Sequence, residues 1–267
     1  MGGVPVGLAA ARAAVEVAAA DAAGLIGSAS GPDLEKPARG LDWTVGQTAA
    51  HVVASTRSLG GLALRRIAPE PGVDLAEVNL SRIAQVGVRD PAALADLLVE
   101  EAARFLADTA GRPADDSFPF YGGATANLAA VTAILLGEYL VHCLDIARSL
   151  GRPWRIDPGH ARLVIAGSTA VLPAYVDGEA ARDVTVAYDV RVRGGPRFTF
   201  RLAEGRASVE PARAGPVDCH ISADPVAFLL VSYGREPQWR PILLGRLAAW
   251  GRRPWRAFAF KRLLADP

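Results

Sequence analysis

The chain has 267 residues, of which 51% are hydrophobic, and its 29 lysine and arginine side chains are nearly matched by 28 aspartate and glutamate side chains. This length can bury one large core or two modest ones, and the balanced charge argues against a general nucleic-acid-binding protein. With only Cys143 and Cys219, the sequence has no disulfide framework and fits a reducing cytoplasm.

The N-terminal run is rich in alanine but is interrupted by Arg12, Glu16 and Asp21. It therefore predicts an amphipathic first helix rather than a signal peptide. We expect no apolar stretch to reach the roughly 20 residues that span a bilayer. The chain is thus predicted to be cytoplasmic and to have no membrane partner. Its oligomeric state is not fixed by the sequence, which is compatible with a monomer.

A second helix is predicted to begin after Thr44. Thr44 and Gln47 have the spacing of a capping box, and an apolar run follows as far as Leu64. His51 then lies about two turns into the helix, among alanine and valine, where a neutral imidazole costs free energy unless its ring nitrogens are satisfied. A metal ion would satisfy one nitrogen, although a single histidine on a helix is more often a hydrogen-bonded core residue.

A third, buried helix is predicted over residues 127–150, ending at Gly151. Glu138 and His142 are four residues apart, so they project from the same face. Asp145 follows on that face, where it can either hydrogen-bond a ligating imidazole and fix its tautomer or serve as a ligand itself. By itself the Glu-x-x-x-His pair is weak evidence, because such pairs occur in many solvated helices.

Two segments resemble a known family. Residues 41–51 (LDWTVGQTAAH) and residues 138–148 (EYLVHCLDIAR) resemble the two signatures of the mycothiol-dependent maleylpyruvate isomerase family, within the DinB-like superfamily, and occur in the expected order. The resemblance implies an N-terminal four-helix bundle. It also implies that a divalent metal ion, usually zinc, is held by His51, Glu138 and His142.

The composition changes near residues 153–159, which predicts two domains, over residues 1–155 and 156–267. The second domain should contain strands and helices. A β-hairpin over 183–192 and 197–202, two further strands over 206–210 and 217–221, and helices beginning at 224–225 and at 254 are predicted, in chain order.

Residues 221–235 and 244–251 resemble the sterol-carrier-protein-like domain that is attached to the same isomerase family. The chain departs from that family at Gly251-Arg252, where the family often has Gly-Asp, and this puts the contacts there in doubt. The fold class implied is mixed: a DinB-like four-helix bundle followed by a smaller α+β domain. The resemblance also implies that the second domain packs against the bundle and helps to form a thiol-binding cleft.

Three protein ligands leave one coordination position open, which is the arrangement of catalytic zinc sites. A metal ion there lowers the pKa of a bound water or thiol. Because the resembled isomerase uses the thiol of mycothiol as its nucleophile, we predict a metal-dependent, mycothiol-using transferase or isomerase that acts on a small-molecule electrophile. Two alternatives stay open: a hydrolase that activates water, and a non-catalytic protein that binds an apolar ligand. Histidine and glutamate ligands also suit nickel or iron.

Asp145 and Arg235 are the remaining candidate catalytic residues. Arg235 can hold a substrate or thiol carboxylate through a bidentate contact, and would then also bind the cofactor thiol; the alternative is a solvated arginine after a helix. Residues 118–123 (FPFYGG) are a candidate cleft rim or a plug for the end of the bundle. His160 and His220 have no partners at ligand spacing, so we interpret both as structural.

Near the C-terminus, arginines alternate with aromatic residues, which are Trp239, Trp250, Trp255, Phe258 and Phe260. Such a mixture can bind a phosphate backbone and stack bases. We favour a closing helix whose aromatic side chains pack on the sheet while the arginines reach water. Lys36 and Lys261 are the only lysines, so the arginine content indicates a GC-rich genome, as in an actinobacterium.

Overall fold

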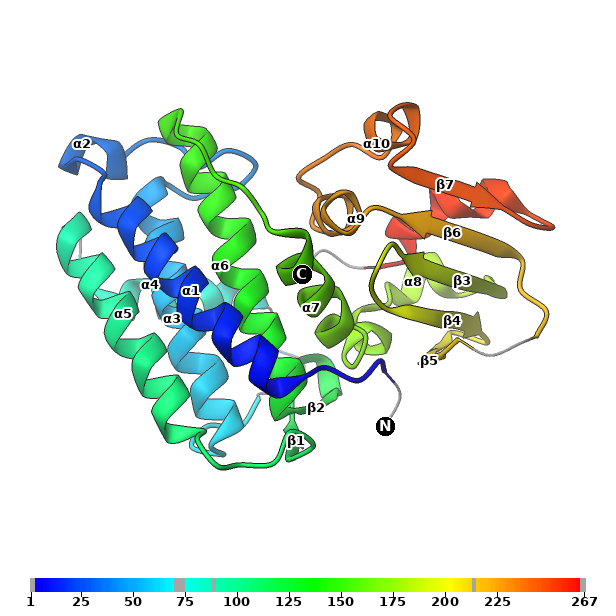
Figure 1. Cartoon of the computed structure of the whole chain (residues 1–267), viewed down its shortest axis with the longest axis horizontal. Coiled ribbons are helices and arrows are strands. Elements are labelled where there is room, and N and C mark those ends of the chain that lie inside the picture. The colour runs from blue at the N-terminus through cyan, green and yellow to red at the C-terminus, as the bar shows by residue number, and fades with distance from the viewer. Residues whose placement is uncertain (1–2, 70–74, 88–89, 213–214, 265–267) are drawn as a thin grey trace.

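A computed structural model of the chain describes residues 3–69, 75–87, 90–212 and 215–264. A helical bundle and a smaller part built on a β-sheet lie side by side (Figure 1), each with its own buried hydrophobic cluster. The predicted fold class, a helical bundle followed by a smaller α+β part, is confirmed. Helix α7 (Pro158–Ser168) contributes Val164 to the first cluster and Ile165 to the second. The boundary between residues 155 and 156 therefore remains a prediction.

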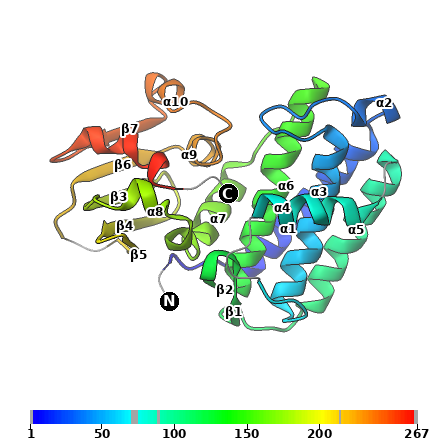
Figure 2. The same ribbon diagram turned by 180° about the vertical axis from the view of Figure 1, so that it is seen from behind.

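The bundle consists of four long helices, which are α1 (Leu8–Gly27), α3 (Val45–Ala63), α5 (Pro91–Asp108) and α6 (Leu128–Leu150). Helices α1 and α3 each pack against α5 and α6, so the four surround one core. Two shorter helices, α2 (Gly31–Leu34) and α4 (Leu75–Val86), add Leu34, Ile83 and Val86 to the same buried cluster. Helix α4 packs against α3 and lies across the bundle on the face seen in Figure 2.

The helix starts follow from their capping residues. The Thr44 side chain accepts a hydrogen bond from the Gln47 amide at 3.1 Å, and the Gln47 side chain accepts one from the Thr44 amide at 2.8 Å. This confirms the predicted capping box of α3. Asn127 caps α6 by accepting from the Ala130 amide at 2.9 Å. Gly151 ends α6 at a φ of 65°, a left-handed conformation that glycine adopts readily.

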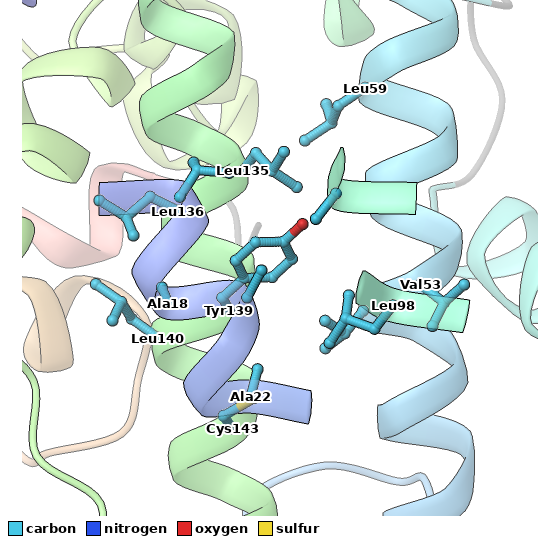
Figure 3. Packing of buried hydrophobic residues seen from close by; sticks show 14 of the residues in the cluster. Ala18, Ala22, Val53, Leu59, Leu98, Leu135, Leu136, Tyr139, Leu140 and Cys143 are labelled. Atoms are coloured by element: carbon cyan, nitrogen blue, oxygen red, sulfur yellow. The ribbon is translucent and has the colours of Figure 1, made fainter. Parts of the chain in front are cut away.

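Helix α6 supplies much of the bundle core. Leu135, Leu136 and Tyr139 are completely buried, and Figure 3 shows the Tyr139 ring directed toward Val53 and Leu98 of the facing helices. The Tyr139 hydroxyl is satisfied by the Thr56 side chain at 3.0 Å. By length and composition α6 could cross a membrane, so the prediction that no segment is long and apolar enough was wrong. However, 89% of its apolar window is buried inside the protein, as in a core helix.

The second part contains a five-stranded sheet in the order β5-β4-β3-β6-β7. Its strands are β3 (Val186–Val192), β4 (Arg197–Ala203), β5 (Arg206–Pro211), β6 (Cys219–Ala223) and β7 (Leu247–Trp250). Neighbouring strands are antiparallel except for the parallel pair β3 and β6. The predicted hairpin and the two following strands are confirmed, whereas β7 was not predicted. Asp224 caps α9 (Pro225–Ser232), as predicted.

Several short elements connect these parts. They are β1 (Ser117–Pro119), η1 (Tyr121–Gly123), β2 (Thr125–Asn127), η2 (Leu172–Tyr175), α8 (Gly178–Ala181), α10 (Trp239–Leu243), η3 (Pro254–Ala259) and η4 (Lys261–Leu263). Strands β1 and β2 pair antiparallel on either side of η1, and η1 contacts η2. The segment predicted as a cleft rim or bundle plug is therefore a small hairpin with a 3₁₀ turn at its tip.

The expectation of a closing helix from residue 254 was wrong, because the chain forms two 3₁₀ turns, η3 and η4. Side chains three residues apart share one side of a 3₁₀ turn, and Ala257, Phe260 and Leu263 are the buried ones. The opposite side faces solvent, so Trp255 and Phe258 are 63% and 56% exposed. The predicted packing of the aromatic side chains on the sheet thus holds for Phe260 and fails for these two. Trp239 and Trp250, which the prediction also included, are exposed as well.

Candidate metal site

His51 from α3 and Glu138 and His142 from α6 converge within the bundle. Each offers one ligand atom, and the three atoms lie within 4.8 Å of one another. Glu138 Oε2 is 3.1 Å from His51 Nε2 and 3.6 Å from His142 Nε2. Metal–ligand bonds of about 2.0–2.1 Å in a tetrahedron separate neighbouring ligand atoms by about 3.3 Å. Two imidazoles and a carboxylate at this spacing fit a divalent metal ion, and we call the three residues the candidate metal site.

Burial and mutual contact set the charge of the candidate metal site. The side chains of His51, His142 and Glu138 are 6%, 11% and 18% exposed. Burial lowers the pKa of His51, although its contact with Glu138 opposes the change. Burial alone would raise the pKa of Glu138, but the hydrogen bond with His51 and the charge of His142 lower it to about 2. At neutral pH these shifts favour a carboxylate and a neutral imidazole, the forms that bind metal.

Ser55 and Trp43 complete the immediate surroundings. The Ser55 hydroxyl donates to Glu138 Oε2 at 3.0 Å and lies 3.2 Å from His51 Nε2. The Trp43 ring centroid is 4.7 Å from that of His51 and 6.3 Å from that of His142. Since Trp43 immediately precedes the α3 capping residue, the capping box also fixes the chain that carries the indole. Ser55 was missed at the sequence level, although it follows His51 at helical spacing.

Asp145 lies on the other side of the His142 ring from Glu138. His142 Nδ1 is 3.7 Å from Asp145 Oδ2, too far for a hydrogen bond. Within the described ranges this buried nitrogen has no hydrogen-bond partner. The completely buried Asp145 instead accepts hydrogen bonds from Arg235, at 3.1 and 3.2 Å from Nε and 2.8 Å from Nη2. Asp145 is thus placed beside the imidazole and outside the group of three candidate ligand atoms.

Arg235 reaches α6 from the second part of the molecule, just after α9. Its side chain is 13% exposed, so it is not a solvated arginine. Besides Asp145 it contacts the Tyr233 carbonyl, to which Nη1 donates at 2.6 Å. The guanidinium that we expected to face a ligand carboxylate is therefore directed at a carboxylate of the protein. This contact joins the end of α9 to the helix that carries two of the candidate ligands.

Three tyrosines lie within electrostatic reach of Glu138, and the sequence analysis assigned none of them a role. Burial raises the pKa values of Tyr121, Tyr175 and Tyr233, that of Tyr175 to about 12, and the charge of Glu138 raises all three further. Tyr121 comes from η1, Tyr175 from η2 and Tyr233 from the end of α9. No local sequence pattern links these residues, because they are brought together by tertiary packing.

The remaining candidates lie elsewhere. His220 is on β6, where its Nδ1 is 2.8 Å from Asp189 Oδ2. His160 is on α7 beside the capping residue Asp157. Cys143 is completely buried in the bundle, and burial raises its thiol pKa. Across the described parts of the chain, the candidate metal site is the one group of three such residues spaced for a metal ion.

Residues 15–147 match the family described as the mycothiol maleylpyruvate isomerase N-terminal domain. A crystal structure of a mycothiol-dependent maleylpyruvate isomerase is similar over 86% of this chain and 90% of that chain, with a TM-score of 0.54 and 16% identity. A histidine-to-alanine mutant of such an isomerase is similar over 91% and 93% of the two chains, with a TM-score of 0.52 and 13% identity. At these identities the similarity shows a shared fold.

A sterol carrier protein 2 from Yarrowia lipolytica aligns with 37% of this chain and 87% of that chain at a TM-score of 0.29, too low to support an argument. No curated protein sequence matches the chain. The family match covers α3 and α5 in full and most of α1 and α6, and it contains all residues of the candidate metal site. Through its helical domain the chain therefore belongs to the mycothiol maleylpyruvate isomerase family, a family of enzymes, as its two sequence motifs predicted.

Proposed function

We propose that this protein is a zinc-dependent transferase or isomerase that uses mycothiol to attack a small-molecule electrophile. One observation carries the proposal. Two imidazoles and an ionised carboxylate converge inside a domain whose family is named for a mycothiol-dependent isomerase. The similar crystal structures carry the same activity in their names.

In this proposal His51, Glu138 and His142 hold the metal ion. A divalent ion with three protein ligands and one open position lowers the pKa of a thiol that binds there. The Ser55 hydroxyl donates to Glu138 and so fixes the orientation of its carboxylate. Trp43 packs against His51 and lies near His142.

Asp145 and Arg235 act on the site through His142. Asp145 lies on the Nδ1 side of the ring, so a small movement would let it accept the Nδ1 proton and leave Nε2 free as a ligand. Arg235 holds the Asp145 carboxylate in place. We therefore assign both residues positioning roles, and the ligand set remains His51, Glu138 and His142.

Thiol binding can be tested without measuring turnover. The protein would be loaded with Co²⁺ and titrated with mycothiol, because a thiolate bound to Co²⁺ produces a charge-transfer absorption band. We expect this band in the wild type and its loss in Glu138→Gln. A cobalt-loaded wild type that shows no band at saturating mycothiol would contradict thiol activation. Turnover that proceeds equally well without a thiol would support the alternative, a metal-dependent hydrolase.

A second candidate function is the non-catalytic binding of an apolar ligand. In its favour is a cavity of about 350 Å³ in the second part of the molecule. It is lined by residues from α9, β6, β7 and η3, including Ile221, Phe228, Val231, Leu247, Trp255 and Phe258. A fatty acid that displaces an apolar fluorescent probe from this cavity, in a protein without thiol-dependent turnover, would favour this candidate.

Three broader properties also remain proposals. Both cysteines are free and buried, which agrees with a reducing cytoplasm. We further propose a monomer and an actinobacterial origin, the latter because only two lysines accompany an arginine-rich composition.

A further inference from the structure

Arg82 on α4 is an arginine without an acidic partner next to the candidate metal site. Its guanidinium carbon lies 5.3 Å from the centroid of the Tyr121 ring. Across the described ranges it has no carboxylate within ion-pair distance, and it contacts the Tyr121 side chain. Helix α4 packs against α3, the helix that carries His51.

Arg12 and Arg148 donate to a hydroxyl and to backbone carbonyls. Five other arginines of the bundle are arranged differently. Each has a carboxylate partner within ion-pair distance: the pairs are Arg57 with Glu101, Arg65 with Asp116, Arg66 with Asp108, Arg104 with Glu100, and Arg112 with Asp116. A half-buried arginine without such a partner costs free energy. Arg82 therefore differs from these arginines in having a charge that a ligand could neutralise.

The Tyr121 hydroxyl is the second unsatisfied group at this place. It is buried and, in the described part of the structure, accepts and donates no hydrogen bond. Burial raises the pKa of Tyr121 and Glu138 adds to this, whereas Arg82 and Ser58 oppose it. The hydroxyl is therefore protonated at neutral pH and available as a donor. A buried donor of this kind is normally paired, either with the protein or with a bound molecule.

Helix α3 connects these groups with the candidate metal site. His51, Ser55 and Ser58 recur at helical spacing, so they form one polar stripe. At one end of the stripe Ser55 contacts Glu138. At the other end Ser58 influences Tyr121. Tyr121, with the Arg82 guanidinium near its ring, thus lies beside the stripe of α3 that carries His51.

We propose that Arg82 and the Tyr121 hydroxyl form an anion-binding subsite that holds a carboxylate of the small-molecule electrophile. An arginine presents parallel donors to a carboxylate, and a tyrosine hydroxyl can add a further one. Glu138 is not the counter-charge of Arg82, because its carboxylate is already in contact with His51 and Ser55. The identity of the bound molecule as the electrophile rests on the proposed function, whereas binding of a carboxylate depends only on the subsite.

A purely structural role is the alternative, in which Arg82 holds α4 against η1 through its contact with the Tyr121 ring. Tyr121→Phe separates the two roles, because it keeps the ring and removes the hydroxyl. If the role is only structural, this variant should bind carboxylates as the wild type does. If the subsite is real, binding should weaken while the melting temperature stays equal or rises.

The test is a calorimetric titration of metal-free and zinc-loaded protein with maleate, a small dicarboxylate, and with its uncharged diamide. We expect the wild type to bind maleate more tightly than the diamide. Arg82→Gln should weaken maleate binding about 10- to 100-fold, and Tyr121→Phe about threefold to tenfold. Arg82→Lys should recover part of the loss. Arg66→Gln is the matched control, since Arg66 is paired with Asp108, and it should bind as the wild type does.

Maleate binding that is unchanged in Arg82→Gln, or no tighter than binding of the diamide, would overturn the subsite. Unchanged binding by Tyr121→Phe would overturn its part in the subsite. Zinc content is measured on the same samples. A protein that holds no zinc but binds maleate through Arg82 would contradict the proposed function and support the subsite. If the zinc-loaded wild type and Arg82→Gln bound maleate equally well, the subsite would be contradicted but the proposed function would not.

Discussion

At the residue scale, the pair of Asp145 and Arg235 is the contact with the largest expected effect on stability. Asp145 is completely buried and Arg235 is 13% exposed. Removing the guanidinium in Arg235→Ala leaves a buried carboxylate without its counter-charge. We expect this to lower the free energy of unfolding by about 3–5 kcal/mol. Urea unfolding followed by circular dichroism measures the change.

Arg66→Ala is the control for this prediction. Arg66 and Asp108 also form an ion pair, at 2.9 Å, but their side chains are 62% and 30% exposed. Water screens such a pair, so we expect a change within about 1 kcal/mol. If both variants lost the same small amount of stability, the Asp145 and Arg235 pair would not be the buried contact described here.

Asp189 provides a pH-dependent contribution in the second part of the molecule. Burial by itself raises its pKa, but hydrogen bonds from Arg197, His220 and Arg191 outweigh burial and hold the pKa below its ordinary value of 3.8. Because the folded-state pKa is the lower one, the stabilisation is complete above the unfolded-state pKa and is lost as the pH falls. We expect Asp189→Asn to melt below the wild type at about pH 5, with a difference that shrinks toward about pH 2.

Thermal melting of the two proteins across this pH range measures the effect. A gap in melting temperature that stayed constant or widened toward acid pH would show that the charge of Asp189 is not the source of the stabilisation.

At the scale of single elements, the contact between α6 and α7 depends on a glycine. A Cβ added to Gly167 would lie 2.6 Å from Ala133 Cβ and 2.9 Å from the Ala130 carbonyl oxygen. The two helices would have to separate, so we expect Gly167→Ala to destabilise the protein by about 1–3 kcal/mol. Thermal and urea unfolding both report this change.

Gly24 offers the matched comparison on α1, because a Cβ there meets nothing within 4 Å. Alanine is the better helix former, so Gly24→Ala should stabilise the protein by about 0.5–1 kcal/mol. Opposite signs for the two substitutions support close packing of α6 on α7. A stabilising Gly167→Ala would contradict it.

Elements with strong local signals were predictable from the sequence. Helix α3 has a capping box at Thr44, and α6 lies between Asn127 and Gly151, so both helices begin and end close to where the pattern places them. Strand β7 has no such signal. Of its four residues only the first is buried, because it is an edge strand beside β6, and no alternation results. The parallel pairing of β3 with β6 also depends on packing that local patterns do not encode.

Some features of the candidate metal site were likewise predictable from the sequence, and others depend on tertiary packing. Helical spacing alone places Glu138 and His142 on one face of α6. That His51 meets them depends on how α3 packs against α6, and at the sequence level only the family resemblance supplied it. Ser55 could have been found from its spacing to His51. The contact between Arg82 and Tyr121 could not have been found from the sequence, because α4 and η1 meet only in the folded bundle.

At the scale of the whole molecule, the candidate metal site lies close to the contact between the two parts. Helix α7 packs against both α6 and α9. Arg235 contacts Asp145, and Arg148 donates to the Arg235 carbonyl at 3.2 Å. The second part therefore supports the helix that carries Glu138 and His142. We therefore expect substitutions at this contact to affect the candidate metal site through Asp145.

The metal content of the purified protein tests the central claim most directly. Wild type, His51→Ala, His142→Ala and the control His160→Ala would each be equilibrated with zinc, freed of excess metal and measured by elemental analysis. We expect about one zinc per chain in the wild type and in His160→Ala, and a loss of zinc in the other two variants. A wild type without bound metal, or equal zinc retention in all four proteins, would contradict a metal site formed by His51, Glu138 and His142.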